Sequence, residues 1–184
     1  MFARQFITSK PVDVSPLFLI GMMGSGKTTL GKRLARECKR DFIDLDREIE
    51  RRNGVSVSTI FEIEGEAGFR QRESLLLAEV ATQAGLVIAT GGGTVLNPVN
   101  RARLFASGSV VYLHATASLL FVRTRNDRNR PLLQVADPLE KIRQLVEQRD
   151  PLYREVADIV VEAGRDPDAV VDELKQIFPV LCKH

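Results

Sequence analysis

The feature that most constrains this chain is a glycine-rich segment between an apolar run and a helical pattern. The run Leu17–Ile20 is followed by the letters GMMGSGKTT. Gly21, Gly26, Lys27 and Thr28 fit the spacing G-x-x-x-x-G-K-[ST]. Glycines at these positions let consecutive backbone N–H groups point inward, and the following helix adds partial positive charge. The segment therefore predicts a cradle for phosphate groups, in which Lys27 reaches the terminal phosphates and the Thr28 hydroxyl suits Mg²⁺.

Length and hydrophobic patterning limit the fold class. The chain has 184 residues, of which 44% are hydrophobic, and this fits one domain over residues 1–184 with a buried core. Short apolar runs alternate with amphipathic helical stretches. Strands that are apolar throughout and alternate with helices are typical of a parallel sheet covered on both faces. We therefore predict an α/β fold in three layers, α/β/α, around a central five-stranded parallel sheet.

The expected elements follow this alternation. The expected strands are residues 17–20, 42–43, 86–89, 110–113 and 159–161. The expected helices are residues 27–38, 46–52, 57–62, 67–83, 98–106, 117–124, 139–148 and 168–178. Three of the helix starts are marked by an N-cap residue before a proline, at Asn97, Asp137 and Asp166.

Charge and cysteine content limit the possible partners and the compartment. A net charge of +2 is too small to indicate nucleic-acid binding. No signal-peptide pattern precedes the first strand, and no run approaches the roughly 20 apolar residues that span a bilayer. Cys38 and Cys182 lie in no metal-ligand spacing, and we expect reduced thiols. We therefore predict a soluble cytoplasmic protein with no nucleic-acid or membrane partner, and an N-terminal tail over residues 1–16.

The second anchor for Mg²⁺ is not where many such chains have it. In many proteins with this loop an apolar strand ends in Asp, whereas here the matching strand is followed by Thr90 and three glycines. The letters FIDLD supply another candidate, since Asp44 and Asp46 follow a short strand two residues apart. In extended geometry both would face the same side, one toward the metal and one toward the substrate. An ordinary helix N-cap is the alternative for Asp46.

Seven segments, in order, resemble those of the shikimate kinases. They are GMMGSGKTTLG, FIDLDREIE, GEAGFRQRE, ATGGG, RTRNDRNRPLL, RDPLYREVAD and the loop around Arg165 and Pro167. Together they cover about residues 17–178. The resemblance implies a P-loop kinase fold, similar to that of nucleoside monophosphate kinases, with a mobile lid over about residues 124–137. It also implies transfer of the ATP γ-phosphoryl group to the 3-hydroxyl of shikimate. We expect a monomer, because the lid must move freely and all the expected catalytic residues come from one chain.

The resemblance assigns the residues that bind shikimate. Arg70 and Arg149 would hold its carboxylate with two guanidinium forks. Asp46 would accept hydrogen bonds from the ring hydroxyls, including the attacking one. Glu73 lies three residues after Arg70 on one helix, so it could orient that guanidinium. The glycine triplet (Gly91, Gly92 and Gly93) would let the backbone approach the ring and donate N–H groups.

The resemblance also assigns the phosphoryl-transfer residues. Lys27, Mg²⁺ and Arg130 would supply positive charge around the transferred group, with Arg130 as an arginine finger in cis. Closure of the lid would exclude water. The expected catalytic residues are Lys27, Asp46 and Arg130, and the expected Mg²⁺ ligands are Thr28 and Asp44. The expected ATP-binding residues are Gly24, Ser25, Gly26, Lys27, Thr28, Thr29, Arg123, Arg130, Arg165 and Asp166.

Other readings of the phosphate cradle stay open. A gluconate kinase would share the cradle and the fold, but would not be expected to keep Arg70 and Arg149 together with the glycine triplet. A nucleoside monophosphate kinase would need a separate set of base-reading residues, which we do not find. A non-catalytic binding protein should have lost Lys27, Asp46 or an arginine. A nucleic-acid motor or sensor should carry the acidic second motif.

Overall fold

A five-stranded parallel sheet forms the centre of the computed structural model, which describes residues 15–127 and 131–179. The strands lie in the order β2-β3-β1-β4-β5 and each neighbouring pair is parallel, as predicted. Their bounds are β1 Leu17–Ile20, β2 Asp41–Asp44, β3 Leu86–Ala89, β4 Ser109–His114 and β5 Ile159–Glu162.

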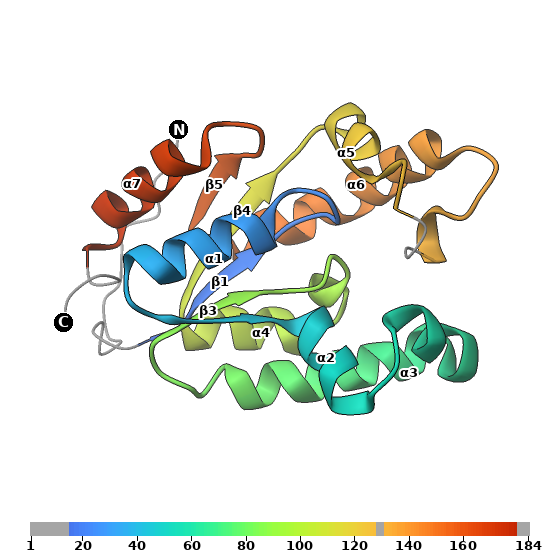
Figure 1. Cartoon of the computed structure of the whole chain (residues 1–184), viewed down its shortest axis with the longest axis horizontal. Coiled ribbons are helices and arrows are strands. Elements are labelled where there is room, and N and C mark those ends of the chain that lie inside the picture. The colour runs from blue at the N-terminus through green and yellow to red at the C-terminus, as the bar shows by residue number, and fades with distance from the viewer. Residues whose placement is uncertain (1–14, 128–130, 180–184) are drawn as a thin grey trace.

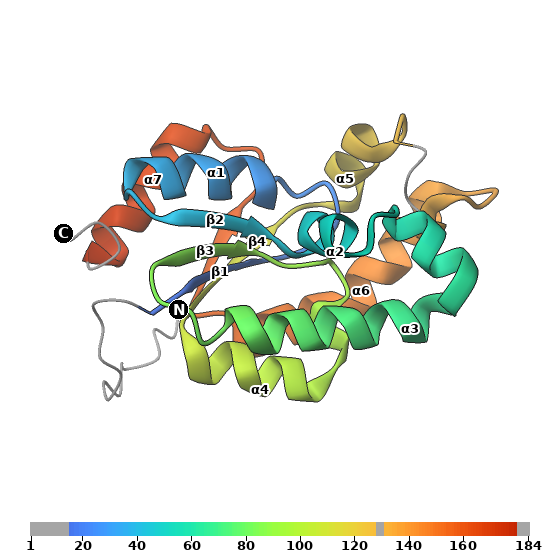
Figure 2. The same ribbon diagram turned by 60° about the horizontal axis from the view of Figure 1, so that its bottom comes forward.

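Helices cover both faces of this sheet. They are α1 Lys27–Glu37, α2 Leu45–Asn53, α3 Val57–Val80, α4 Pro98–Ser107, α5 Ala117–Thr124, α6 Pro138–Val156 and α7 Pro167–Ile177, with short 3₁₀ turns η1 Thr94–Leu96 and η2 Pro131–Leu133. Figure 1 shows their arrangement, and Figure 2 shows α1 and α7 above the sheet with α3, α4 and α6 below it.

The central strand β1 packs against both helical layers. Successive side chains of a strand point to opposite faces. Leu17 and Leu19 belong to the core on the side of α1 and α7, whereas Phe18 and Ile20 belong to the core on the side of α3, α4 and α6. All four side chains are completely buried. The three-layer prediction is therefore confirmed.

The parallel arrangement determines where polar groups can gather. The loops that follow β1, β2 and β3 leave the sheet at the same edge, because these strands run in one direction and are neighbours. Ligands of open α/β sheets bind at the carboxyl ends of the strands. The segments predicted to bind phosphate, metal and substrate all follow one of these three strands or come from helices packed beside them.

Helix α3 differs from the prediction of two separate helices over residues 57–62 and 67–83. It runs from Val57 to Val80, interrupted at Gly65, whose φ of 71° and ψ of −179° are not helical. This backbone conformation is essentially restricted to glycine. The chain therefore breaks direction at one residue rather than through a loop.

Helix α6 also differs from the prediction, which ended it at Gln148 ahead of Pro151. It continues through Pro151 to Val156. A proline inside a helix removes one backbone hydrogen bond and crowds the carbonyl four residues earlier. The continuation buries Tyr153 and Val156, which are 0% and 4% exposed, and burial of such side chains opposes that cost.

Cys38 is buried at the end of α1 and is disulfide-bonded. The expectation of a reduced thiol is therefore wrong for this residue. The other cysteine of the sequence, Cys182, lies outside the described residues, as do residues 1–14 of the predicted tail.

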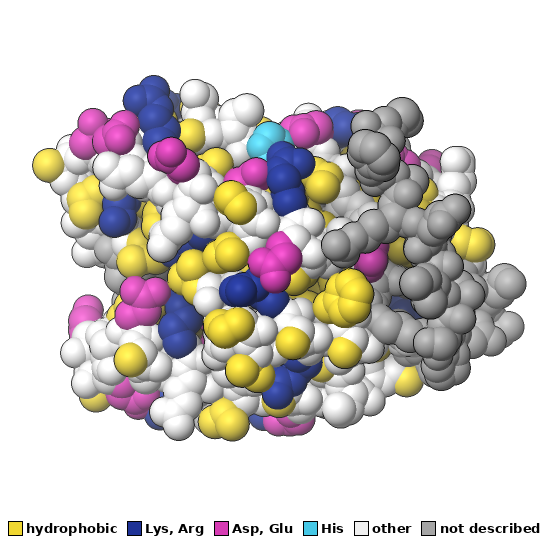
Figure 3. Space-filling view, turned by 180° about the vertical axis from the view of Figure 1, so that it is seen from behind, with side chains coloured by type: hydrophobic (Ala, Val, Ile, Leu, Met, Phe, Trp, Pro, Cys, Tyr) yellow, Lys and Arg dark blue, Asp and Glu magenta, His cyan; other side chains and the backbone are white. Residues whose placement is uncertain are grey.

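The surface carries charges of both signs. Figure 3 shows the face opposite to that of Figure 1, where basic and acidic side chains are interspersed and hydrophobic ones lie among them. In the part of the chain that the structure describes, no helix combines the length and the apolarity needed to cross a membrane.

The break at Gly65 generates a stability prediction. A Cβ added at Gly65 or at Gly54 meets no atom of the described residues within 4 Å, so packing does not distinguish the two sites. Gly54 has φ 69° and ψ 10°, a left-handed conformation that other residues adopt at moderate cost. We expect Gly65→Ala to lower the free energy of unfolding by about 2–3 kcal/mol and Gly54→Ala by about 1 kcal/mol. Urea denaturation measures both, and equal losses would contradict the assigned break.

Candidate active site

A cavity of about 1240 Å³ lies at the carboxyl edge of the sheet. Its wall combines the phosphate loop (residues 21–28), the start of α2, part of α3, the glycine triplet and α6. Of the predicted site residues, the cavity is lined by Gly24, Ser25, Gly26, Lys27, Thr28, Thr29, Asp44, Asp46, Arg70, Gly91, Gly92, Gly93, Arg123, Arg149 and Arg165. The fold thus brings together residues from positions 24 to 165.

The phosphate loop is held in place by its neighbours. A side chain at Gly21, where φ is +140°, would place its Cβ 2.6 Å from the Leu113 carbonyl oxygen, so only glycine fits. Arg123 of α5 donates from Nη1 to the carbonyls of Gly24 and Ser25, at 3.2 Å each. Lys27 Nζ donates to the carbonyls of Gly21 and Met22 at 2.8 Å each. The lysine amine therefore lies within the loop that is predicted to hold phosphate.

Thr28 and Asp44 meet at the base of the cavity. Thr28 Oγ1 donates to Asp44 Oδ2 at 2.6 Å. A hydroxyl and a carboxylate are ligands that suit Mg²⁺, which keeps several waters and binds substrate phosphates. Among the described residues there is no cluster of three or more His, Cys, Asp or Glu that could hold a metal. The residues present fit the predicted metal.

The structure corrects the geometry expected of Asp46. Asp44 Oδ1 accepts the backbone N–H groups of Asp46 and Arg47, at 3.2 and 3.3 Å, and so Asp44 is the N-cap of α2. Asp46 lies in the first helical turn and not on an extended strand. Both carboxylates nevertheless line the cavity.

Asp46 is an unusual carboxylate. Its Oδ1 is buried and has no hydrogen-bond partner among the described residues. Burial raises the pKa of Asp46 to about 6, with further contributions from the nearby carboxylates of Glu73 and Asp44, while Lys27 and Arg70 oppose the increase. A carboxylate with this pKa accepts a proton more readily than an ordinary one, as a general base requires.

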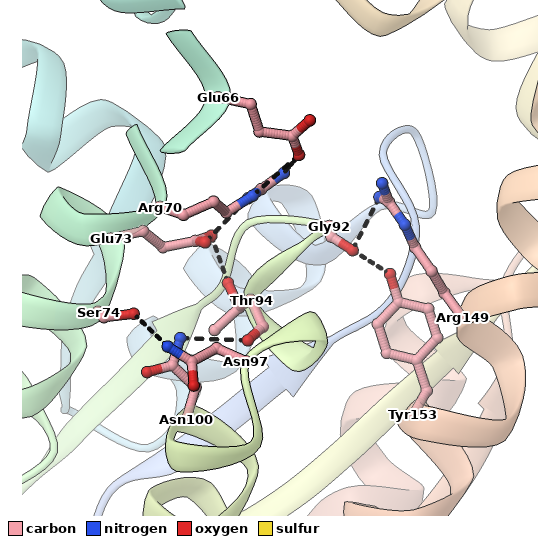
Figure 4. Close-up of polar contacts among 10 residues, drawn as sticks. All are labelled: Glu66, Arg70, Glu73, Ser74, Gly92, Thr94, Asn97, Asn100, Arg149 and Tyr153. Atoms are coloured by element: carbon pink, nitrogen blue, oxygen red, sulfur yellow. Dashed lines mark hydrogen bonds and ion pairs between the residues drawn. The ribbon is translucent and has the colours of Figure 1, made fainter. Parts of the chain in front are cut away.

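Arg70 is held by two carboxylates. Its Nη1 donates to Glu73 Oε2 at 2.8 Å, and its Nη2 donates to Glu66 Oε1 at 3.0 Å (Figure 4). The predicted orientation of Arg70 by Glu73 is confirmed. Glu73 is completely buried, and its other oxygen accepts a hydrogen bond from Thr94 Oγ1. These hydrogen bonds from Arg70 to Glu73 and Glu66, together with the bond from Thr94 to Glu73, hold the Arg70 guanidinium in one position.

Arg149 faces the same glycine triplet from the opposite side. It is 3% exposed, and its Nη1 donates to the Gly92 carbonyl at 3.1 Å. Its Nε is buried without a partner, and no ion pair between described residues involves it. Gly93 lies against Arg70, since a Cβ there would collide with the guanidinium. A buried charged group is usually paired, and among the described residues Arg149 has no carboxylate partner.

Two predicted ATP contacts are not found in the cavity wall. Arg130 lies outside the described residues, as do Arg128 and Asn129 of the predicted lid, and its role stays a prediction. Asp166 is the N-cap of α7, where its side chain accepts the N–H groups of Asp168 and Ala169, and it is not part of the cavity wall. Arg165 lines the cavity and pairs with Glu173 at 2.6 Å.

Sequence reasoning missed Tyr153 and Thr94. No role is assigned to Tyr153 from the sequence, whereas in the structure its hydroxyl donates to the Gly92 carbonyl. Thr94 holds Glu73. The signal for Tyr153 was its position four residues after Arg149, which places both side chains on one face of a helix.

The comparison with known proteins agrees with this geometry. The family model described as shikimate kinase matches residues 23–178. The chain belongs to the shikimate kinase family. It is 59% identical to a shikimate kinase of Aromatoleum aromaticum in an alignment of 171 residues that covers 90% of this chain and 98% of that protein. The structure of shikimate kinase from Acinetobacter baumannii in complex with shikimate has a TM-score of 0.88 at 44% identity, over 91% of this chain and 94% of that one.

A gluconokinase of Sinorhizobium meliloti 1021 also resembles the chain. Its TM-score is 0.60 at 16% identity, over 94% of this chain and 95% of that one. At this identity the likeness shows a shared P-loop kinase fold and nothing about the acceptor. The predicted resemblance to shikimate kinases is therefore confirmed over the gluconate kinase alternative.

The raised pKa of Asp46 generates a pH prediction. Because the folded chain favours protonated Asp46, this carboxyl contributes stability below its ordinary pKa of 3.8, and the contribution is lost as the pH rises through about 6. Asp46→Asn carries no charge at any pH. We expect the variant to exceed the parent in free energy of unfolding by about 1–3 kcal/mol at pH 8, and by much less at about pH 4.5. Urea denaturation without Mg²⁺ or substrates tests this, and a gain that does not change with pH would contradict the assigned cause.

Proposed function

We propose that this chain transfers the γ-phosphoryl group of ATP to the 3-hydroxyl of shikimate, giving shikimate 3-phosphate and ADP. The observation that carries the proposal is the buried Arg149, which has no carboxylate partner within residues 15–127 and 131–179 and faces Arg70 across the glycine triplet. A small acceptor with one carboxylate would supply the missing charge. The same cavity contains the phosphate loop, so donor and acceptor would meet in one place.

The shikimate carboxylate would bind between Arg70 and Arg149. Guanidinium groups bind carboxylates through paired, charge-assisted hydrogen bonds. Glu73 and Glu66 already hold Arg70, so its position would not depend on the substrate. Arg149 has its Nε available for the new contact. The glycine triplet would admit the ring, because side chains at Gly91 or Gly93 would occupy the space beside Asp46 and Arg70.

Asp46 would accept the proton of the attacking hydroxyl. Its unpartnered Oδ1 and raised pKa both suit this role. In a loose phosphoryl-transfer transition state the proton moves late, so orientation of the hydroxyl would be the larger contribution. Lys27 would neutralise charge on the transferred phosphoryl group.

Mg²⁺ would be held by Thr28 and Asp44, and it would supply positive charge to the phosphates of bound ATP. Arg130 remains a prediction as the arginine finger. We further propose that the chain acts as a cytoplasmic monomer, since all the residues assigned above belong to one chain.

The acceptor is tested by ADP release with Mg²⁺ and ATP, with shikimate, gluconate or AMP in parallel. We expect a large stimulation by shikimate alone, because only shikimate combines a rigid ring with a carboxylate that reaches both arginines. Phosphate on the 3-hydroxyl, located by NMR of the product, completes the assignment. ADP release that does not respond to shikimate would contradict the proposed function.

Removal of the Arg149 side chain should weaken binding of shikimate and not of ATP. We expect Arg149→Ala to raise KM for shikimate by roughly 30-fold or more, as for loss of a buried charge partner, and to leave KM for ATP within about two-fold. Arg154→Ala is the matched control, because Arg154 lies on the same helix, is half exposed and binds Asp150 instead. Steady-state kinetics with both substrates measures the difference. An unchanged shikimate KM in Arg149→Ala would refute the carboxylate clamp.

Loss of the Lys27 side chain should lower the rate of turnover. We expect Lys27→Ala to lower kcat by roughly 100- to 1000-fold, the scale for one electrostatic catalytic group. Circular dichroism and shikimate binding should stay near the parent values, because Lys27 lies in the phosphate loop, whereas the proposed carboxylate clamp is formed by Arg70 and Arg149. Near-normal turnover would exclude Lys27 from phosphoryl transfer.

A further inference from the structure

The Tyr153 hydroxyl is a buried donor aimed at the glycine triplet. The side chain is completely buried on α6, one turn after Arg149, and its hydroxyl donates to the Gly92 carbonyl (Figure 4). Arg149 Nη1 donates to the same oxygen. We propose that Tyr153 is a positioning residue that orients the Gly92–Gly93 peptide for the acceptor. The inference rests on the proposed function.

The peptide geometry makes this contact consequential. A trans peptide is planar, so its C=O and N–H point in opposite directions. Figure 4 shows the Gly92 carbonyl held toward Arg149 and Tyr153 of α6, so the N–H of the next residue, Gly93, points away from α6. Within the described part of the chain this N–H has no hydrogen-bond partner. It is therefore an oriented donor on the side of the cavity that would receive the acceptor.

The glycine triplet cannot hold this orientation by itself. Glycine has no side chain to pack and adopts more backbone conformations than other residues. The residues that follow are well held, since Asn100 Nδ2 donates to the Thr94 carbonyl at 3.2 Å and Arg101 Nη1 donates to the Val95 carbonyl at 2.8 Å. At Gly92 itself, the two donors from α6 supply the restraint.

Tyr153 and Arg149 differ in how permanent their bond to Gly92 can be. Arg149 would turn toward a bound carboxylate, and that movement weakens its bond to the Gly92 carbonyl. The one other acceptor of the Tyr153 hydroxyl among the described residues is Met22 Sδ at 3.6 Å, and a thioether sulfur is a weak acceptor that shikimate does not alter. Burial raises the pKa of Tyr153 well above its ordinary value, so the hydroxyl remains a donor. Tyr153 therefore keeps the peptide oriented both before and after the acceptor binds, which is preorganisation.

The ring of Tyr153 is itself fixed by a stack. Tyr112 of β4 lies against it with ring centroids 4.8 Å apart. The Tyr112 hydroxyl points elsewhere and donates to Asp150 Oδ1 at 2.8 Å, and Asp150 also accepts from Arg154 Nε at 2.6 Å. The stack thus contains two buried tyrosines, one with its hydroxyl on the glycine triplet and one with its hydroxyl directed away from the cavity.

Tyr153→Phe and Tyr112→Phe form a matched pair, since each removes one hydroxyl from the same stack. We expect Tyr153→Phe to raise KM for shikimate roughly 5-fold, the value of one net hydrogen bond, while KM for ATP and shikimate-independent ATP hydrolysis stay unchanged. Tyr112→Phe should leave both KM values within about two-fold. An unchanged shikimate KM in Tyr153→Phe, or equal changes in both variants, would overturn the inference.

A second readout needs no substrate. In the ligand-free chain labelled with ¹⁵N-glycine, we expect Tyr153→Phe to shift the Gly92 and Gly93 amide signals and Tyr112→Phe to leave them in place. If the Gly92 and Gly93 amide signals shift in neither variant, the positioning role of Tyr153 is wrong. Because this measurement does not depend on turnover, it separates failure of this inference from failure of the proposed function, which would appear as absence of shikimate-dependent ADP release in the parent chain.

Discussion

The Glu73 carboxylate is completely buried, and the organisation of the cavity depends on the groups that compensate its negative charge. Arg70 supplies the opposite charge at 2.8 Å, and Thr94 supplies a neutral donor. Glu73 thereby anchors α3 to the turn after β3. It also raises the pKa of Asp46, second to the effect of burial. One buried carboxylate thus positions a binding arginine and increases the basicity of the proposed proton acceptor.

Arg149 has no such partner among the described residues, and in the proposed function this asymmetry is what would make the cavity prefer an anionic acceptor. The two guanidinium groups lie on either side of the glycine triplet, one neutralised by the protein and one not. Helix α6 can present Arg149 and Tyr153 together only because it continues through Pro151. The buried contacts of its last two turns offset the missing hydrogen bond. The binding side of the cavity therefore depends on a helix that local rules would end early.

Sequence reasoning was most successful where local chemistry decides the structure. The phosphate loop, the apolar strands and the prolines at helix starts all follow from backbone and burial constraints that act within a few residues. The pairing of Glu73 with Arg70 follows from helical spacing. The membership of the cavity wall from Gly24 to Arg165 agrees with the family resemblance.

The misses arose where tertiary contacts override local preference. Asp44 rather than Asp46 caps α2, because Thr28 already draws the Asp44 carboxylate to the helix start. Tyr153 resembles a core residue in sequence because nothing near it reveals a backbone carbonyl 61 positions away. Such contacts connect helices and strands that are distant in sequence, so they leave no periodic pattern in the sequence.

The central claim is that Arg70 and Arg149 recognise one carboxylate, and the most direct measurement is kcat/KM for shikimate beside that for its carboxamide. The amide keeps the ring and the hydroxyls but removes the charge. The account predicts that the parent chain prefers the acid by roughly 100-fold or more, as expected for a buried charge pair, and that Arg149→Ala loses most of this preference. Equal kcat/KM values for the acid and the amide in the parent chain would show that the two arginines do not recognise a carboxylate.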